Sequence, residues 1–381
     1  MYTNTTQYLR ALASDLVHGC RRTAADGTVI YTPDGTASYD GLWLRDFSYM
    51  VEYAGFAIPD QDIVNCIRYA VRHRRADGWM PDRVTTDGLA VYAAGIAAAP
   101  VGEANLDNTP FLIFTVDSLS RRMDPEDFLP LFTEWEADLE QGLFLLPLEE
   151  HGLVYNDVQK PHSPYGFTDT IGKTGTLYME SLLYWRACRM MERMCKTYGV
   201  GNPDHFADAA EAVERSLSLL FDPAAGAFYA ATKDCHQYDI WGMAYMLYIG
   251  FPCSADEKQA VLSFLEKNYD ACVYRGQVRH LLKGQYWERL LIDVEPETYQ
   301  NGAYWATASG WMIWCLAQQN PALAVRALED VVSCFKTDGS FECINEGYEK
   351  LPLFVVSATN VCGGFERTIS DFPEFGAGKI D

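Results

Sequence analysis

Several classes of protein are excluded by what this 381-residue sequence lacks. No stretch of about 18 apolar residues occurs, so the sequence predicts no transmembrane helix. The N-terminal segment resembles an amphipathic helix and has neither the basic start nor the apolar centre of a signal peptide, so we expect a cytoplasmic protein. Positive charge is scarce, because 30 Lys and Arg stand against 52 Asp and Glu, a net charge of −22. We therefore expect neither nucleic acid nor an anionic membrane as a partner.

The cysteines form no recognisable framework. There are 11 of them, an odd number, and they are scattered along the chain. No Cys-x-x-Cys pair and no Cys/His cluster with zinc spacing occurs. We interpret them as reduced thiols of the core, with a disulfide framework as the less favoured alternative. The sequence implies no metal or cofactor, and it does not indicate an oligomeric state.

Helix signals follow one another along the whole chain, without a Pro-, Ser- or Gly-rich linker. An Asn, Asp or Thr cap followed by proline occurs four times, at 109–110, 124–125, 202–203 and 320–321. Ser254 and Glu257 have the spacing of a capping box. We predict a single domain over residues 1–381. The predicted helices fall near 3–19, 44–56, 60–75, 108–122, 125–145, 173–199, 203–221, 238–249, 254–270, 302–318, 321–335 and 354–368.

These helices pair in order into six helix–loop–helix units with a loose period. Several of the loops are long, at 20–43, 77–107, 146–172, 271–300 and 336–353. Long loops in a compact domain are usually functional. In a ring of helical hairpins they would gather at one end, around the mouth of a central cavity.

The long loops are rich in aromatic and carboxylate residues, a combination that suits a sugar. Aromatic rings stack on the apolar C–H faces of a sugar, while planar polar groups bind its hydroxyls. Two carboxylates on opposite sides of a glycosidic bond can act as general acid and general base. Trp79, in the second long loop, is a candidate stacking platform.

Short motifs in these loops, in order, resemble those of the six-hairpin (α/α)6 glycosidase clan: glucoamylases, trehalases, processing α-glucosidases and the glucosidase domain of glycogen-debranching enzymes. The motifs are Trp43-x-Arg45-Asp46, Asn105-x-Asp107, Phe167-Thr-Asp169 followed by Gly172-Lys173 and Glu180, Gln300-Asn301-Gly-x-x-Trp305, and Glu346 before Tyr348. The resemblance implies an all-α, (α/α)6 toroid and hydrolysis of glycosidic bonds. The usual Trp-Met before the acid is Phe-Thr here, and the last motif offers two glutamates.

The resemblance also implies roles for individual residues. Asp169 would be the general acid and Glu346 the general base, with Glu342 as a second candidate for the base. The remaining candidates would bind substrate: Trp43, Arg45, Asp46, Trp79, Asp107, Lys173, Asn301, Trp305 and Glu342.

We therefore expect an inverting exo-glycoside hydrolase that acts on a short α-glucoside or a related oligosaccharide. Two alternatives stay open. A sugar isomerase or epimerase on the same toroid would typically need a histidine pair in the cavity, and the seven histidines are dispersed. A carbohydrate-binding toroid that has lost its acid or its base would bind without turnover.

Overall fold

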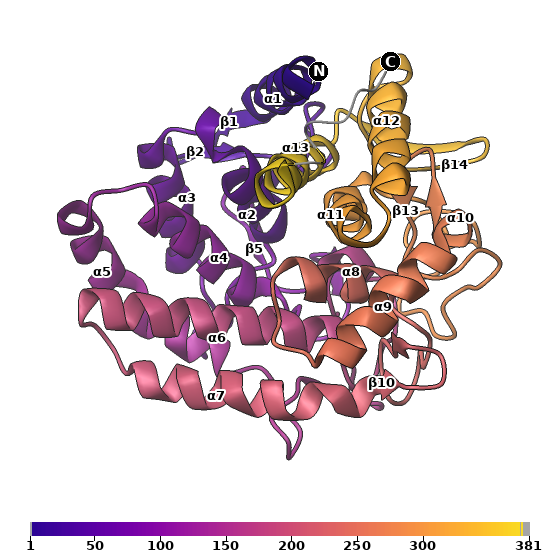
Figure 1. Cartoon of the computed structure of the whole chain (residues 1–381). Coiled ribbons are helices and arrows are strands. Elements are labelled where there is room, and N and C mark those ends of the chain that lie inside the picture. The colour runs from indigo at the N-terminus through magenta and orange to yellow at the C-terminus, as the bar shows by residue number, and fades with distance from the viewer. Residues whose placement is uncertain (1, 374, 376–381) are drawn as a thin grey trace.

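The computed structural model is built mainly of helices and describes residues 2–373 and 375 (Figure 1). The predicted domain over 1–381 also includes residues 1, 374 and 376–381, which lie outside the described residues. Every predicted helix is present, and α10 adds one short turn. The helices are α1 (Tyr2–Gly19), α2 (Leu44–Ala54), α3 (Asp60–Arg72), α4 (Asn108–Ser120), α5 (Pro125–Leu143), α6 (Tyr178–Tyr198), α7 (Pro203–Ser216), α8 (Ile240–Tyr248), α9 (Ala255–Lys267), α10 (Tyr269–Cys272), α11 (Ser309–Gln319), α12 (Pro321–Thr337) and α13 (Val355–Asp371).

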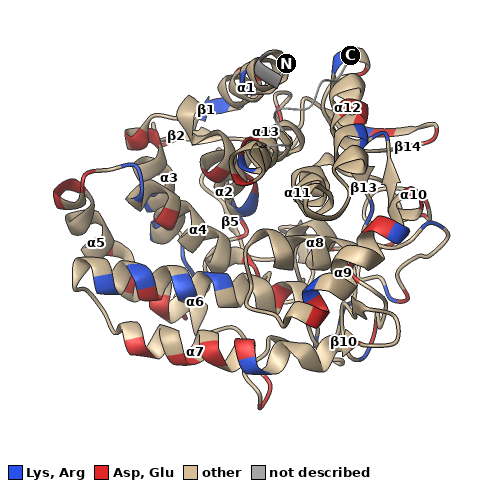
Figure 2. Cartoon of the chain, in the orientation of Figure 1, with Lys and Arg blue, Asp and Glu red and all other residues tan. Residues whose placement is uncertain are grey.

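One set of helices forms the interior. Six helices contact one another in series, in the order α2, α4, α6, α8, α11 and α13. The series closes into a ring because α13 packs against α2. Of these, α8 and α11 are apolar on nearly every side, and all nine residues of α8 are buried. A helix that is hydrophobic all round belongs in a core. Figure 2 shows α8 and α11 without charged residues. The arrangement is consistent with an (α/α)6 fold.

The outer helices are amphipathic and cover this interior. In α7 the buried residues are Phe206, Ala210 and Val213, spaced by about one turn each, so a single stripe faces α6. The exposed sides of α6 and α7 carry charges of both signs (Figure 2). Asn202 caps α7 by accepting from the Asp204 N–H, and Ser254 and Glu257 form the predicted capping box of α9.

Short antiparallel strand pairs occupy the loops between the helices, and one of them contains Val29–Tyr31, within the strand-like sequence run at 27–31. The strands are β1 (Arg21–Thr23), β2 (Val29–Tyr31), β3 (Gly41–Trp43), β4 (Arg83–Thr85), β5 (Ala90–Val91), β6 (Gly95–Ile96), β7 (Ala99–Pro100), β8 (Tyr155–Asn156), β9 (Gly175–Thr176), β10 (Phe221–Asp222), β11 (Ala227–Phe228), β12 (Val273–Tyr274), β13 (Gln277–Val278), β14 (Phe341–Asn345) and β15 (Tyr348–Pro352). The β3–β4 pair joins the first two long loops by placing Trp43 opposite Arg83.

Within the described residues, none of the helices has the length and apolar character that crossing a bilayer requires. All cysteines are free thiols, and only Cys253 is not fully buried.

Candidate active site

A cavity of about 300 Å³ lies where the inner helices begin. Arg45 and Asp46 belong to the first turn of α2, Phe354 is the N-cap of α13, and Asp169 lies in the loop before α6. Its charged and hydroxyl-bearing lining consists of Arg45, Asp46, Asp169, Thr170, Glu342 and Lys350. Its aromatic lining consists of Tyr39, Trp43, Phe167, Tyr299 and Phe354. The cavity thus combines rings with carboxylates, as the loop composition predicted.

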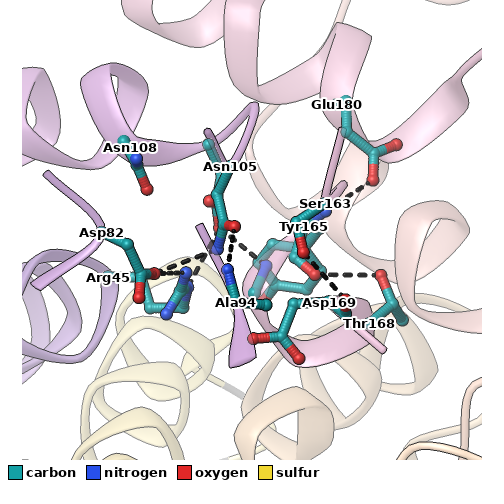
Figure 3. Close-up of polar contacts among 12 residues, drawn as sticks. Arg45, Asp82, Ala94, Asn105, Asn108, Ser163, Tyr165, Thr168, Asp169 and Glu180 are labelled. Atoms are coloured by element: carbon teal, nitrogen blue, oxygen red, sulfur yellow. Dashed lines mark hydrogen bonds and ion pairs between the residues drawn. The ribbon is translucent and has the colours of Figure 1, made fainter. Parts of the chain in front are cut away.

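Arg45 is fixed by two buried aspartates, and Figure 3 shows its contact with Asp82. Its Nε donates to Asp107 Oδ2 at 3.1 Å, and its Nη2 donates to Asp82 Oδ1. Asn105 also donates to Asp82 Oδ1, at 3.0 Å, and Arg83 donates to the other oxygen at 2.7 Å. Both aspartates are fully shielded from solvent. Asp107, predicted to bind substrate, therefore holds Arg45 instead of lining the cavity.

Asp169 has the environment that a general acid needs. It follows the short 3₁₀ turn Gly166–Thr168 and is buried. Gln300 Nε2 donates to Asp169 Oδ1 at 2.8 Å, while Ser163 fixes the backbone by donating to the Asp169 carbonyl. Burial raises the pKa of Asp169 to about 7, although the nearby positive charge of Arg45 opposes the rise. A carboxyl with this pKa can hold a proton near neutral pH and release it during a reaction.

Asp46 and Trp43 present groups that a ligand can use. Burial raises the pKa of Asp46 to about 8, so at neutral pH its carboxyl is mainly protonated. The Trp43 indole N–H is shielded from solvent and has no hydrogen-bond partner among the described residues. The Arg83 guanidinium lies 4.4 Å from the centre of the Trp43 ring and holds that ring in place. Asp46 and Trp43 both line the cavity.

Glu342 is the second catalytic candidate that the structure brings to the cavity. It lies on β14, and only 4% of its side chain is exposed. Tyr39 donates its hydroxyl hydrogen to Glu342 Oε1 at 2.9 Å, and Lys350 forms an ion pair with Oε2. Burial raises the pKa of Glu342, and the Lys350 ammonium opposes that rise. Glu342 is thus a buried carboxylate with a cation beside it.

Glu346 does not reach the cavity, contrary to the prediction that it is the base. It is exposed in the turn between β14 and β15, where its N–H bonds to Asn345 Oδ1 at 2.8 Å. Cys343 and Ile344 are still buried, and the chain becomes exposed only at the turn that carries Glu346. Glu342, the second candidate, occupies the place that the prediction gave to Glu346.

Two other predicted substrate-binding residues are aromatic packing residues. Trp79 is buried and lies 5.5 Å from His162, ring centre to ring centre. Trp305 is completely buried; it donates to the Tyr299 carbonyl at 3.2 Å and meets Phe167 edge to face. Neither lines the cavity, but Trp305 supports two residues that do.

The remaining predicted residues shape the loops. The Lys173 ammonium is buried and donates to Glu180 Oε1 at 2.6 Å, the same oxygen that accepts from the Tyr165 N–H. Glu180 therefore ties together both ends of the loop that carries Asp169. Asn301 accepts from the Trp287 N–H at 3.0 Å and also lies outside the cavity lining.

Sequence reasoning missed several residues of the site. Asp82 lies three residues after Trp79, and Gln300 opens the motif that contains Asn301 but was given no role of its own. These two had a local signal. Tyr39 had none, because it lies 303 residues from Glu342, and Lys350 depends on the pairing of β14 with β15, which was not predicted. As for metals, the described part of the chain contains no group of three or more His, Cys, Asp and Glu placed to hold an ion.

Comparisons with known proteins find similarity in structure only. No family model matches the sequence, and no curated protein matches it. A GH63 mannosylglycerate hydrolase from Thermus thermophilus, solved in complex with glucose, aligns with a TM-score of 0.67 over 94% of this chain and 100% of its own, at 14% identity. A rhamnosidase from Klebsiella oxytoca with rhamnose bound gives 0.62 at 11% identity, covering 95% of this chain and 64% of its own. A protein described as a glycosidase gives 0.64 at 14% identity, covering 98% and 99%. The chain thus has the fold found in these glycosidases.

Proposed function

We propose that this chain is an inverting exo-glycoside hydrolase built on an (α/α)6 toroid, with Asp169 as general acid and Glu342 as general base. One observation carries the proposal: a buried carboxyl with a pKa of about 7 and a second carboxyl paired with a cation line the same cavity. Two carboxyl groups in different environments are what the division of labour between acid and base requires.

Asp169 would protonate the glycosidic oxygen of the leaving group. Its raised pKa keeps the proton available at neutral pH, and the Gln300 amide stabilises the carboxylate that remains after transfer. Arg45 contributes further, because its positive charge favours the ionised form of Asp169. General acid catalysis of this kind contributes a factor of about 10²–10⁴ in rate.

Glu342 would accept a proton from a water molecule that attacks the anomeric carbon from the opposite face. The C–O bond to water forms as the bond to the leaving group breaks, so the configuration inverts. Inversion requires about 6.5–9.5 Å between the two carboxyl groups to leave room for the water. The Lys350 ammonium lowers the pKa of Glu342 against the effect of burial and so favours the deprotonated form that a base needs.

The cavity supports a small sugar ring as the bound group. Trp43, Phe167 and Phe354 provide apolar surfaces, and the Asp46 carboxyl lines the same cavity, where it would bind hydroxyls. A cavity of about 300 Å³ is at the small end of ligand pockets. We therefore propose a short α-glucoside or a related oligosaccharide, cleaved from its end. The ligands named for the similar structures, glucose and rhamnose, support a monosaccharide-sized subsite.

The test is hydrolysis of a panel of substrates by purified protein. The panel contains α- and β-linked glucose disaccharides, the 4-nitrophenyl glycosides of glucose, mannose and rhamnose, and mannosylglycerate. Release of free sugar that is abolished in both Asp169→Asn and Glu342→Gln supports the proposal. Saturable binding without release would instead support a carbohydrate-binding protein, and the appearance of a ketose would support an isomerase.

A further inference from the structure

The ammonium group of Lys350 contacts Glu342 from the neighbouring strand of one hairpin. β14 carries Glu342 and β15 carries Lys350, with Cys343 opposite Lys350 in the register. Regular alternation along the strands would send Glu342 and Lys350 to opposite faces of the hairpin. Leu351 departs from regular strand geometry with a left-handed φ of 48°, and the ion pair forms beside it. Such a conformation in a leucine is costly and is usually kept where function requires it.

Lys350 is anchored in three ways. It forms the ion pair with Glu342 Oε2, donates to the Tyr39 hydroxyl at 2.6 Å, and lies 3.8 Å from the centre of the Tyr299 ring. Tyr39 in turn donates to Glu342 Oε1. Each oxygen of the Glu342 carboxylate therefore has one donor, and the remaining lone pairs can accept from a water molecule. A flexible lysine held by three partners has a defined position instead of a solvated one.

We propose that Lys350 is a positioning residue of this site, which keeps Glu342 ionised and oriented while buried; the inference rests on the proposed function of Glu342 as base. A buried carboxyl without a cation would take up a proton in weakly acidic solution and lose its capacity as a base. The ammonium opposes this uptake of a proton through its ion pair with Glu342.

Lys350 differs in charge from the other titratable groups that surround Glu342. Among the described groups that act on the Glu342 carboxyl, Lys350 is the cation. The others are hydroxyls, thiols or carboxyls: Asp34, Tyr39, Asp46, Tyr299, Cys343 and Tyr348. The largest influences on the pKa of Asp169 are burial, Arg45, Asp82, Gln300 and Asp107. Removal of Lys350 should therefore change one limb of a pH profile and leave the other in place.

The experiment compares Lys350→Met with the wild type in two measurements. The first is the pH dependence of kcat/KM on the best substrate of the panel. The midpoint of the acidic limb should move to higher pH by about 1 pH unit or more, which is the size of the effect that a neighbouring cation has on the pKa of a carboxyl. The midpoint of the basic limb should not move. Lys350→Arg keeps the charge and should restore the acidic limb. Lys267→Met removes an exposed lysine of α9 and should change nothing.

The second measurement needs no substrate. Protein labelled with ¹³C at the glutamate carboxyl is titrated by NMR, with the Glu342 signal identified by its loss in Glu342→Gln. The Glu342 midpoint should rise in Lys350→Met. An unchanged midpoint, or a fall in kcat/KM that is uniform across pH, would overturn the inference. A raised midpoint with no hydrolysis of any probe supports the role of Lys350 toward Glu342 and overturns the proposed function instead.

Discussion

Replacing Gly166 by alanine should displace Arg45 from the cavity. The Arg45 side chain lies directly on Gly166, so a Cβ at this position would overlap the guanidinium and the Cδ that carries it. The loop cannot easily retreat, because the Gly166 N–H donates to Asp107 Oδ2 at 2.8 Å. Asp107 also accepts from Arg45, so the same aspartate holds both colliding groups.

The cost follows from the burial of the pairs that break. The Arg45 side chain is 5% exposed, and those of Asp82 and Asp107 are 0% exposed. Breaking a buried ion pair so that its charges are left uncompensated costs about 3–5 kcal/mol. We expect the free energy of unfolding of Gly166→Ala to fall by that amount. Activity should fall by about 10²-fold or more, because the loop that carries Asp169 would be misplaced.

Urea unfolding at pH 7 measures the loss of stability, and kcat/KM on the same protein measures the loss of activity. Gly19→Ala is the matched control, since a Cβ there meets no atom within 4 Å. A Gly166→Ala protein that unfolds within about 0.5 kcal/mol of the wild type, the range of a neutral surface change, would refute the reasoning.

Three further predictions concern the carboxyl groups. Burial raises the pKa of Asp169 to about 7, so between about pH 4 and pH 7 the native state keeps a proton that the unfolded chain has lost. The contribution of Asp169 to the free energy of unfolding is therefore complete below about pH 4 and falls as the pH rises toward 7. The melting temperature of Asp169→Asn relative to the wild type should therefore increase from pH 4 to pH 8, and a constant difference would contradict the raised pKa. Gln300→Leu removes the donor that favours ionised Asp169, so the basic limb of kcat/KM, expected near pH 7, should move to higher pH; a shift to lower pH would argue against this contact. Glu342→Gln should lower kcat/KM by about 10²–10⁴-fold, while the exposed Glu346→Gln should retain wild-type activity, and the reverse result would return the base to Glu346.

The helices could be predicted from the sequence because their signals are local. Proline after a capping residue at Asn202 and Asn320, and the capping box at Ser254, each concern a few neighbouring residues. The strand-like run at 27–31 contains β2, but most of the other strands were not predicted, because two- and three-residue strands have no periodicity to detect.

The candidate site was predictable only in part. Arg45, Asp46 and Asp169 carried a local motif, and the structure brings all three to the cavity. The partners that determine their chemistry depend on tertiary contacts: Tyr39 reaches Glu342 from a distant loop, and Lys350 reaches it across the β14–β15 hairpin. The choice between Glu342 and Glu346 also depended on the direction of a hairpin, which a sequence motif does not record.

The central claim is most directly tested by the anomer that is first released. We would follow hydrolysis by ¹H NMR with the best substrate of the panel and record the anomeric signals before mutarotation. The account predicts that the first product has the configuration opposite to that of the substrate, and that neither Asp169→Asn nor Glu342→Gln produces it at a comparable rate. First release of the anomer with retained configuration would contradict an acid and base acting from opposite faces.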